Sequence, residues 1–212
     1  YGAPGLDNIA LLKLFNKKEI EKKLRCELSN NVILLCYHPV TLEDANPINT
    51  LEKIFKAIEK IPNTSVIASK SNSDAFGMII NKFLVQKLEE KKLILKASFG
   101  QQLFLSLIKV SDVMIGNSSS GIIEAPSLGT PTINIGNRQK GRLKAKSIIN
   151  CSENYKDIDV CLKKIFSKNN ISIKNNIKNP YGFPGASKKI AKKLAHAPLE
   201  NILFKSFREA NI

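Results

Sequence analysis

The stretch DVMIGNSSSGIIEAPSLGTPTINIGNRQKGR, which runs from Asp112 to Arg142, contains the unit that decides the fold. Two short apolar runs, residues 112–116 and 131–135, have the length and composition of buried strands. A helix that begins near the serines and carries Ile122 and Ile123 joins them. This order of strand, helix and strand predicts two parallel strands connected by a crossover helix.

The same alternation extends along the chain. Three further apolar runs have the character of buried strands, and three longer segments repeat their apolar residues at helical spacing. The strands are residues 32–37, 65–69 and 93–97, and the helices are residues 51–61, 74–91 and 103–108. We therefore predict an α/β fold with a doubly wound, Rossmann-like parallel sheet, whose ligand lies beyond the carboxyl ends of the strands.

The two ends of the chain differ from this pattern. Residues 1–30 read as a helical approach, in which Asn16 and Glu19 form a possible capping box. We expect residues 31–185 to form the Rossmann-like domain, with a helix after Cys151 that ends near residue 167. Residues 186–212 read as a C-terminal helical tail.

The amino-acid composition argues against nucleic-acid binding, metal binding and membrane association. The chain carries a formal net charge of +15, but only four of its basic residues are arginines and it has no tryptophan, so it lacks the arginine forks and stacking platforms typical of nucleic-acid binding. Four cysteines are scattered singly, which indicates free thiols and no metal site. With no bilayer-length apolar run and no signal peptide, we expect a cytoplasmic protein that binds neither nucleic acid nor membrane.

The serine turn suggests an anion site. Ser118, Ser119, Ser120 and Gly121 open a helix, where unpaired N–H groups and the helix dipole attract phosphate oxygens. Plain N-capping is the alternative interpretation. Glu124 follows one turn later, where its carboxylate can accept hydrogen bonds from ribose hydroxyls.

Other loops at the same edge carry candidate ligands. Arg138 and Arg142 follow a strand, and a guanidinium suits a diphosphate, although a solvated basic loop is the alternative. His38 directly follows a strand and is a candidate acid, base or phosphate donor, or a structural histidine. His196, on the terminal helix, reads as a surface or packing residue. Residues 71–74 and 99–101 are further candidates for sugar or base contacts.

Three segments together, YHPVTLED, NSSSGIIEAPSLGTPTINIGNRQKGR and NPYGFPGASKKI, resemble the hydrolysing UDP-N-acetylglucosamine 2-epimerases of sialic and legionaminic acid synthesis. The resemblance covers nearly the whole chain. It implies the C-terminal half of a glycosyltransferase-B architecture, with an N-terminal half missing and a homo-oligomer as the full-length protein. Non-hydrolysing relatives carry His-Arg-Arg-Glu-Asn where this chain has HPVTL from His38, which favours the hydrolysing branch.

The resemblance also implies roles for individual residues. The diphosphate would be held by the serine turn, the ribose by the glutamate, and the uracil by backbone near a phenylalanine. An arginine would make a further UDP contact, and a histidine would face the reacting diphosphate. The residues concerned are Ser118, Ser119, Glu124, Arg138, Phe99 and His38.

The implied reaction releases UDP and a free sugar inverted at C2, N-acetylmannosamine or a 6-deoxy-diacetamido analogue, with no cofactor. The carboxylates that move protons in the family belong to the missing half, so the isolated chain is expected to be inactive. Two alternatives stay open: a UDP-sugar glycosyltransferase, which would transfer the sugar instead of releasing it, and a non-catalytic basic binding module, whose affinity for nucleic acid would fall steeply with salt.

Overall fold

A six-stranded parallel sheet forms the centre of the molecule, with the strand order β3-β2-β1-β4-β5-β6. The computed structural model describes residues 1–40, 46–72, 76–167, 177–198, 200 and 203. The strands are β1 (Asn31–Cys36), β2 (Thr64–Ser69), β3 (Ile94–Lys96), β4 (Val113–Gly116), β5 (Thr132–Ile135) and β6 (Ile148–Cys151). The order reverses direction between β1 and β4, which makes the carboxyl ends of these two strands the topological switch point.

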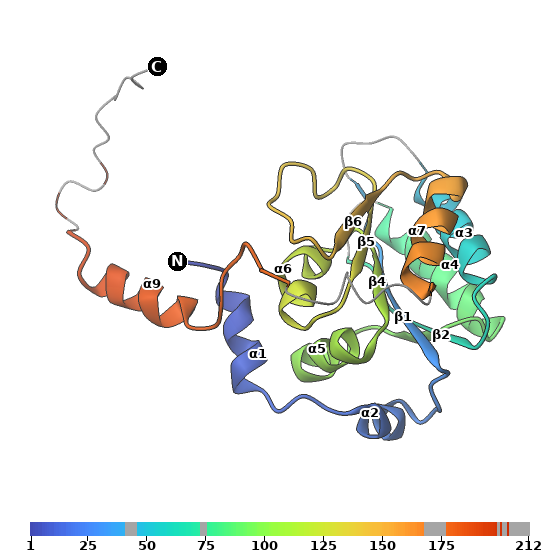
Figure 1. The fold of residues 1–212 in the computed structure, drawn as a ribbon, viewed down its shortest axis with the longest axis horizontal. Helices are drawn as coiled ribbons and strands as arrows, with labels where there is room; N and C mark the ends of the chain where they lie inside the picture. Colours follow the sequence, from blue (N-terminus) through green and yellow to red (C-terminus); the bar gives the residue numbers. More distant parts are fainter. Residues whose placement is uncertain (41–45, 73–75, 168–176, 199, 201–202, 204–212) are drawn as a thin grey trace, which may run out of the picture.

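Helices cover both faces of the sheet (Figure 1). One face packs against α3 (Pro47–Ile58), α4 (Gly77–Glu89) and α7 (Tyr155–Phe166), and the other against α2 (Lys17–Leu24), α5 (Gly100–Val110) and α6 (Ser120–Ser127). Burial on both faces explains why the central strands are continuous apolar runs. The predicted doubly wound α/β class is confirmed.

Local sequence explains where several helices begin. In α2, the Asn16 side chain accepts a hydrogen bond from the Glu19 N–H while the Glu19 carboxylate accepts one from the Asn16 N–H, which confirms the predicted capping box. Asn46 caps α3 ahead of Pro47 in the first turn. The helix expected from residue 74 begins at Gly77, and residues 73–75 lie outside the described residues.

Strand β6 was not predicted. Its first and last residues are buried, but Ile149 is half-buried and Asn150 is exposed, so no continuous apolar run marks this edge strand. The segment before it is basic and polar, so the sequence resembles a loop. Pairing with β5 supplies the backbone partners that make it a strand.

The N-terminal segment contacts the residues that lead into α9. The approach segment consists of a 3-10 turn, η1 (Pro4–Leu6), a short α1 (Asp7–Leu11) and α2. The Asp7 carboxylate accepts hydrogen bonds from the N–H groups of residues 185, 186 and 187 at the start of α9 (Ala186–Ala195). Hydrogen bonds from the Ser187 side chain and these N–H groups lower the pKa of Asp7 to about 2. Asp7 therefore anchors α9, which projects away from the sheet (Figure 1).

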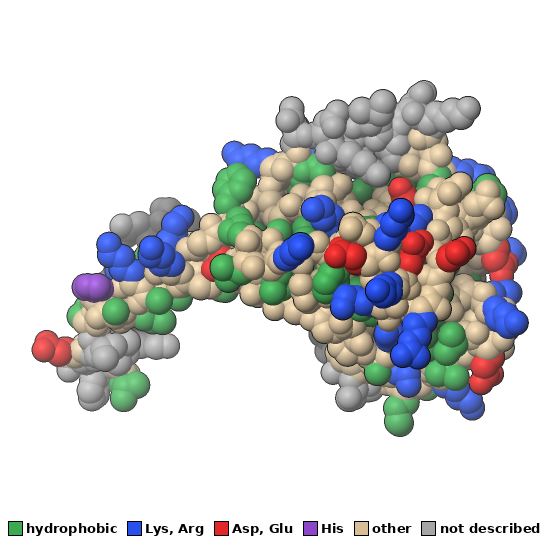
Figure 2. All heavy atoms as spheres, turned by 90° about the horizontal axis from the view of Figure 1, so that it is seen from below, with side chains coloured by type: hydrophobic (Ala, Val, Ile, Leu, Met, Phe, Trp, Pro, Cys, Tyr) green, Lys and Arg blue, Asp and Glu red, His purple; other side chains and the backbone are tan. Residues whose placement is uncertain are grey.

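The charged side chains are spread over the surface. Figure 2 shows Lys and Arg side chains mixed with Asp and Glu on one face of the body, with further lysines along α9. Among the described residues, no helix combines the length and the apolar character needed to cross a membrane.

Replacing Asp7 with Asn should loosen α9, because an amide cannot match the carboxylate as an acceptor for three N–H groups. We expect faster hydrogen exchange at the amides of Ala186 and Ser187, with the amides of α5 as the internal control. In the unmodified chain, the lowered pKa of Asp7 means that this anchor is fully present above about pH 4 and is lost as the pH falls towards 2. Unchanged exchange in Asp7→Asn would contradict this role.

Replacing Gly116 with Ala should destabilise the fold by roughly 2–4 kcal/mol, as measured by urea unfolding. Gly116 ends β4 with a φ of +133°, and an added Cβ would lie 2.1 Å from the Cys36 carbonyl oxygen. Gly129→Ala is the matched control, because Gly129 also has a positive φ of +75° but an added Cβ would meet nothing within 4 Å. Equal losses in the two variants would show that the steric contact with β1 is unimportant.

Candidate functional site

Asn117 ties together three loops at the switch point. Its Nδ2 donates to the His38 carbonyl oxygen at 2.8 Å, and its Oδ1 accepts from the His38 N–H at 2.8 Å. The Asn117 carbonyl oxygen accepts hydrogen bonds from Arg138 Nη1 at 3.1 Å and from Gln139 Nε2 at 2.8 Å. The loops after β1, β4 and β5 are therefore held against one residue, which is itself 1% exposed.

The serine turn lies directly after Asn117 at the start of α6. Ser119 is the N-cap residue, but its side chain makes no capping hydrogen bond, and the Ser118 hydroxyl accepts only a long bond of 3.4 Å from the Ser120 N–H. Plain N-capping by Ser119 therefore does not explain the run of serines. Gly121 allows the turn to pack closely against β5, because an added Cβ would lie only 2.7 Å from Thr132 Cγ2.

Glu124 lies one turn into α6 and is partly buried. Its Oε2 is buried and has no hydrogen-bond partner among the described residues. Burial raises the pKa of Glu124, and a hydrogen bond from the Ser120 side chain offsets part of that rise. Glu124 is therefore held in a partly desolvated position within the first turns of α6.

His38 follows β1 at the same edge of the sheet. Its Nδ1 lies 3.3 Å from the Ser71 hydroxyl, and the Ser71 N–H donates to Asn81 Oδ1 at 2.7 Å. The Asn117 side chain holds the backbone of His38 through two hydrogen bonds, which we call the Asn117 clamp, and Ser71 contacts the imidazole. Together these contacts position His38 at the switch point. Residues 73 and 74, which were also candidates, lie outside the described residues.

Phe99 lies on the same edge but away from the serine turn. It precedes α5 beyond the end of β3, and the strand order puts β2 and β1 between β3 and β4. Together with Ser69, Lys70 and Gln101 it lines a hollow of about 310 Å³. The structure thus brings His38, Arg138 and the serine turn together, and leaves Phe99 at a separate position on the rim.

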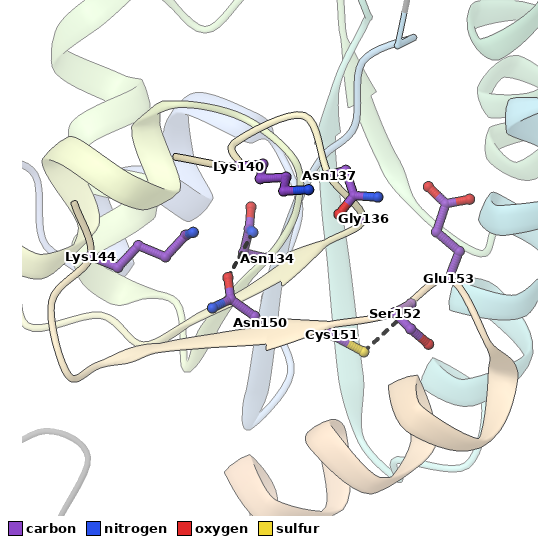
Figure 3. Close-up of a pocket in the computed structure, with 9 residues that line it drawn as sticks. All are labelled: Asn134, Gly136, Asn137, Lys140, Lys144, Asn150, Cys151, Ser152 and Glu153. Atoms are coloured by element: carbon purple, nitrogen blue, oxygen red, sulfur yellow. Dashed lines mark hydrogen bonds between the residues drawn. The ribbon is translucent and has the colours of Figure 1, made fainter. Parts of the chain in front are cut away.

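Several neighbours of the site were not expected from the sequence. Asn117 and Gln139 were overlooked, although an Asn placed directly after a strand-ending glycine was a signal that could have been used. A cavity of about 650 Å³ beside β5 and β6 was also missed (Figure 3). Arg142 is exposed, and His196 lies exposed at the end of α9. The described residues include no group of three or more His, Cys, Asp or Glu side chains that could hold a metal ion.

Replacing Asn117 with Asp should cost roughly 2–4 kcal/mol of stability, because a carboxylate oxygen would face the His38 carbonyl oxygen in place of a donor. Urea unfolding measures the loss, and faster exchange of the His38 amide would localise it. Asn30→Asp, at an exposed position, is the matched control. A loss no larger than that of the control would mean that the clamp does not hold these loops.

Comparison with known structures agrees with the observed fold. A solved UDP-N-acetylglucosamine 2-epimerase from Methanocaldococcus jannaschii, in complex with UDP-GlcNAc and UDP, aligns with a TM-score of 0.69 at 19% identity over 92% of this chain and 54% of that one. The C-terminal domain of a group 1 glycosyltransferase from Francisella tularensis aligns with a TM-score of 0.53 at 10% identity, over 82% of this chain and 94% of that one. These similarities show a shared fold, as predicted for the C-terminal half of a glycosyltransferase-B architecture.

Sequence comparison is more specific. A curated GDP/UDP-N,N'-diacetylbacillosamine 2-epimerase (hydrolyzing) from Campylobacter jejuni is 40% identical over 159 residues, which cover 74% of this chain and 41% of that protein. The chain thus spans less than half the length of this relative. The model of the family described as UDP-N-acetylglucosamine 2-epimerase matches residues 1–195. On this match the resemblance seen in the sequence is confirmed, and the chain belongs to the UDP-N-acetylglucosamine 2-epimerase family.

Proposed function

We propose that this chain is the UDP-binding half of a hydrolysing UDP-N-acetylglucosamine 2-epimerase, which releases UDP and a free sugar inverted at C2. The observation that carries the proposal is the Asn117 clamp, because it gathers His38, Arg138 and the serine turn at the switch point. In a doubly wound sheet this is where a nucleotide binds. Membership of the epimerase family favours this function over glycosyl transfer or simple basic binding.

The proposed pose follows the chemistry of each group. The hydroxyls and N–H groups of residues 118–121 and the Arg138 guanidinium would bind the diphosphate. Glu124 would accept hydrogen bonds from the ribose hydroxyls, and backbone near Phe99 would contact the uracil. His38 would face the diphosphate at the reacting end.

Two observations support hydrolysis. The Campylobacter jejuni relative is named as a hydrolysing 2-epimerase of GDP/UDP-N,N'-diacetylbacillosamine. The residues from His38 onward read HPVTL, which departs from the His-Arg-Arg-Glu-Asn run of the non-hydrolysing relatives. The product would be N-acetylmannosamine or a 6-deoxy-diacetamido analogue.

The proposed reaction has two steps. A base removes the C2 proton as the bond between C1 and the diphosphate oxygen breaks, which forms a glycal and UDP. Water then adds its hydroxyl to C1 and a proton to the opposite face of C2. The groups at the switch point would stabilise the charge that develops on the departing diphosphate. The proton transfers would need carboxylates from the part of the longer relatives that this chain does not span.

UDP titration of the chain tests the proposal, with Glu124→Gln as the key variant. Loss of a charge-assisted hydrogen bond should weaken UDP binding roughly 10–100-fold. The variant should also bind UDP and 2′,3′-dideoxy-UDP equally, whereas the unmodified chain should prefer UDP. Because burial raises the pKa of Glu124, affinity of the unmodified chain should fall as the pH drops towards that raised value, and the variant should not follow.

Glu52→Gln is the control, since Glu52 is exposed on α3. No UDP binding at millimolar concentration, or no preference for the ribose hydroxyls, would overturn the assignment of this site.

A further inference from the structure

The cavity beside β5 and β6 has the size of a small-molecule site, about 650 Å³. The end of β5, the loop that follows it, and the residues at and beyond the end of β6 form its walls (Figure 3). The lining residues are Asn134, Gly136, Asn137, Lys140, Lys144, Asn150, Cys151, Ser152 and Glu153. None of the residues of the serine turn is among them.

The charge of this lining is unbalanced. Lys140 and Lys144 form no salt bridge within the described part of the chain, and residues 136–147 contain five Lys or Arg and no Asp or Glu. The carboxylate of the lining, Glu153, accepts hydrogen bonds from Thr50 Oγ1 at 2.9 Å and Tyr37 Oη at 3.4 Å. Each Glu153 oxygen thus accepts one hydroxyl, but the carboxylate keeps its charge. The lining therefore carries two ammonium groups against one carboxylate, which leaves an excess of positive charge to attract an external anion.

The floor of the cavity supplies neutral donors. Asn134, which is 2% exposed, donates from Nδ2 to Asn150 Oδ1 at 3.1 Å. This bond uses the Asn150 oxygen and leaves the Asn150 amide N–H groups for a ligand. Figure 3 shows the Lys144 side chain reaching towards this amide pair. A fixed amide and two ammonium groups around one hollow form the donor set that an oxyanion requires.

The cavity lies beside the proposed diphosphate site without including it. Gly116, Asn134 and Asn150 are register partners on β4, β5 and β6, so the cavity floor is one to two strands away from the end of β4. The loop above it is anchored at Gln139, which is 2% exposed and donates to the Asn117 carbonyl oxygen. The lysines are therefore carried on a fixed loop.

We propose that this cavity binds the phosphate or carboxylate group of a small polar metabolite, as a second anion site that UDP does not occupy. The ammonium groups of Lys140 and Lys144 would contact the oxyanion, and Asn150 would donate a hydrogen bond to it or to a neighbouring hydroxyl. The concave, amide-lined shape favours a small molecule over an extended polyanion.

Titration of the 212-residue chain with inorganic phosphate and, separately, with gluconate tests this site, followed by NMR of the backbone amides with saturating UDP present. We expect at least one of the two probes to shift the amides of residues 136–141 and 150–152. The double variant Lys140→Ala/Lys144→Ala should weaken that binding at least tenfold. Lys146→Ala, an exposed residue of the same loop outside the lining, should leave it unchanged.

The outcomes separate this site from the proposed function. A response to phosphate alone identifies a phosphorylated ligand, and a response to gluconate identifies an acidic sugar; both support the site. No response to either probe, an equal loss in Lys146→Ala, or displacement of the probe by UDP would overturn it. Failure of UDP to bind, with phosphate still bound at Lys140 and Lys144, would overturn only the proposed function.

Discussion

The arrangement of the switch point depends on one buried amide. Asn117 uses both polar atoms of its side chain on the backbone of residue 38, and its own carbonyl oxygen on two side chains from the loop after β5. A buried polar group that loses its hydrogen-bond partners keeps its full desolvation penalty. Separating the three loops is therefore strongly unfavourable in free energy. The site therefore exists as a fixed arrangement before any ligand arrives.

Such preorganisation suits a reaction in which a diphosphate leaves. Stabilising a departing anion needs donors that are already oriented, whereas moving a proton from carbon needs a base of suitable pKa. The residues at this edge of the sheet match the first requirement: a serine turn at a helix start, a guanidinium and an imidazole. Under the proposed function, the second requirement would be met by the part of the Campylobacter jejuni relative that this chain does not span.

The sequence was sufficient to predict the architecture because the spacing of apolar residues along a strand or helix is a local property. Continuous apolar runs marked β1, β4 and β5, and Asn16 with Glu19 marked the start of α2. It was insufficient wherever a residue acts across the fold. The β6 strand depends on its partner β5, and Asn117 becomes important only through His38, 79 residues earlier. Lys140 and Lys144 were not singled out, because only the folded chain shows that they line a common hollow.

The contact between Asp7 and α9 links distant parts of the molecule mechanically. Asp7 holds the first turn of α9, and the Ala3 N–H donates to the Tyr181 carbonyl oxygen at 2.9 Å, so residues 3–7 are attached to residues 181–187 at two points. Gly5 lies between these two attachments, and a Cβ there would be 3.3 Å from Glu124 Oε1. Residues 3–7 therefore connect the start of α9 to the surroundings of Glu124 through one short segment.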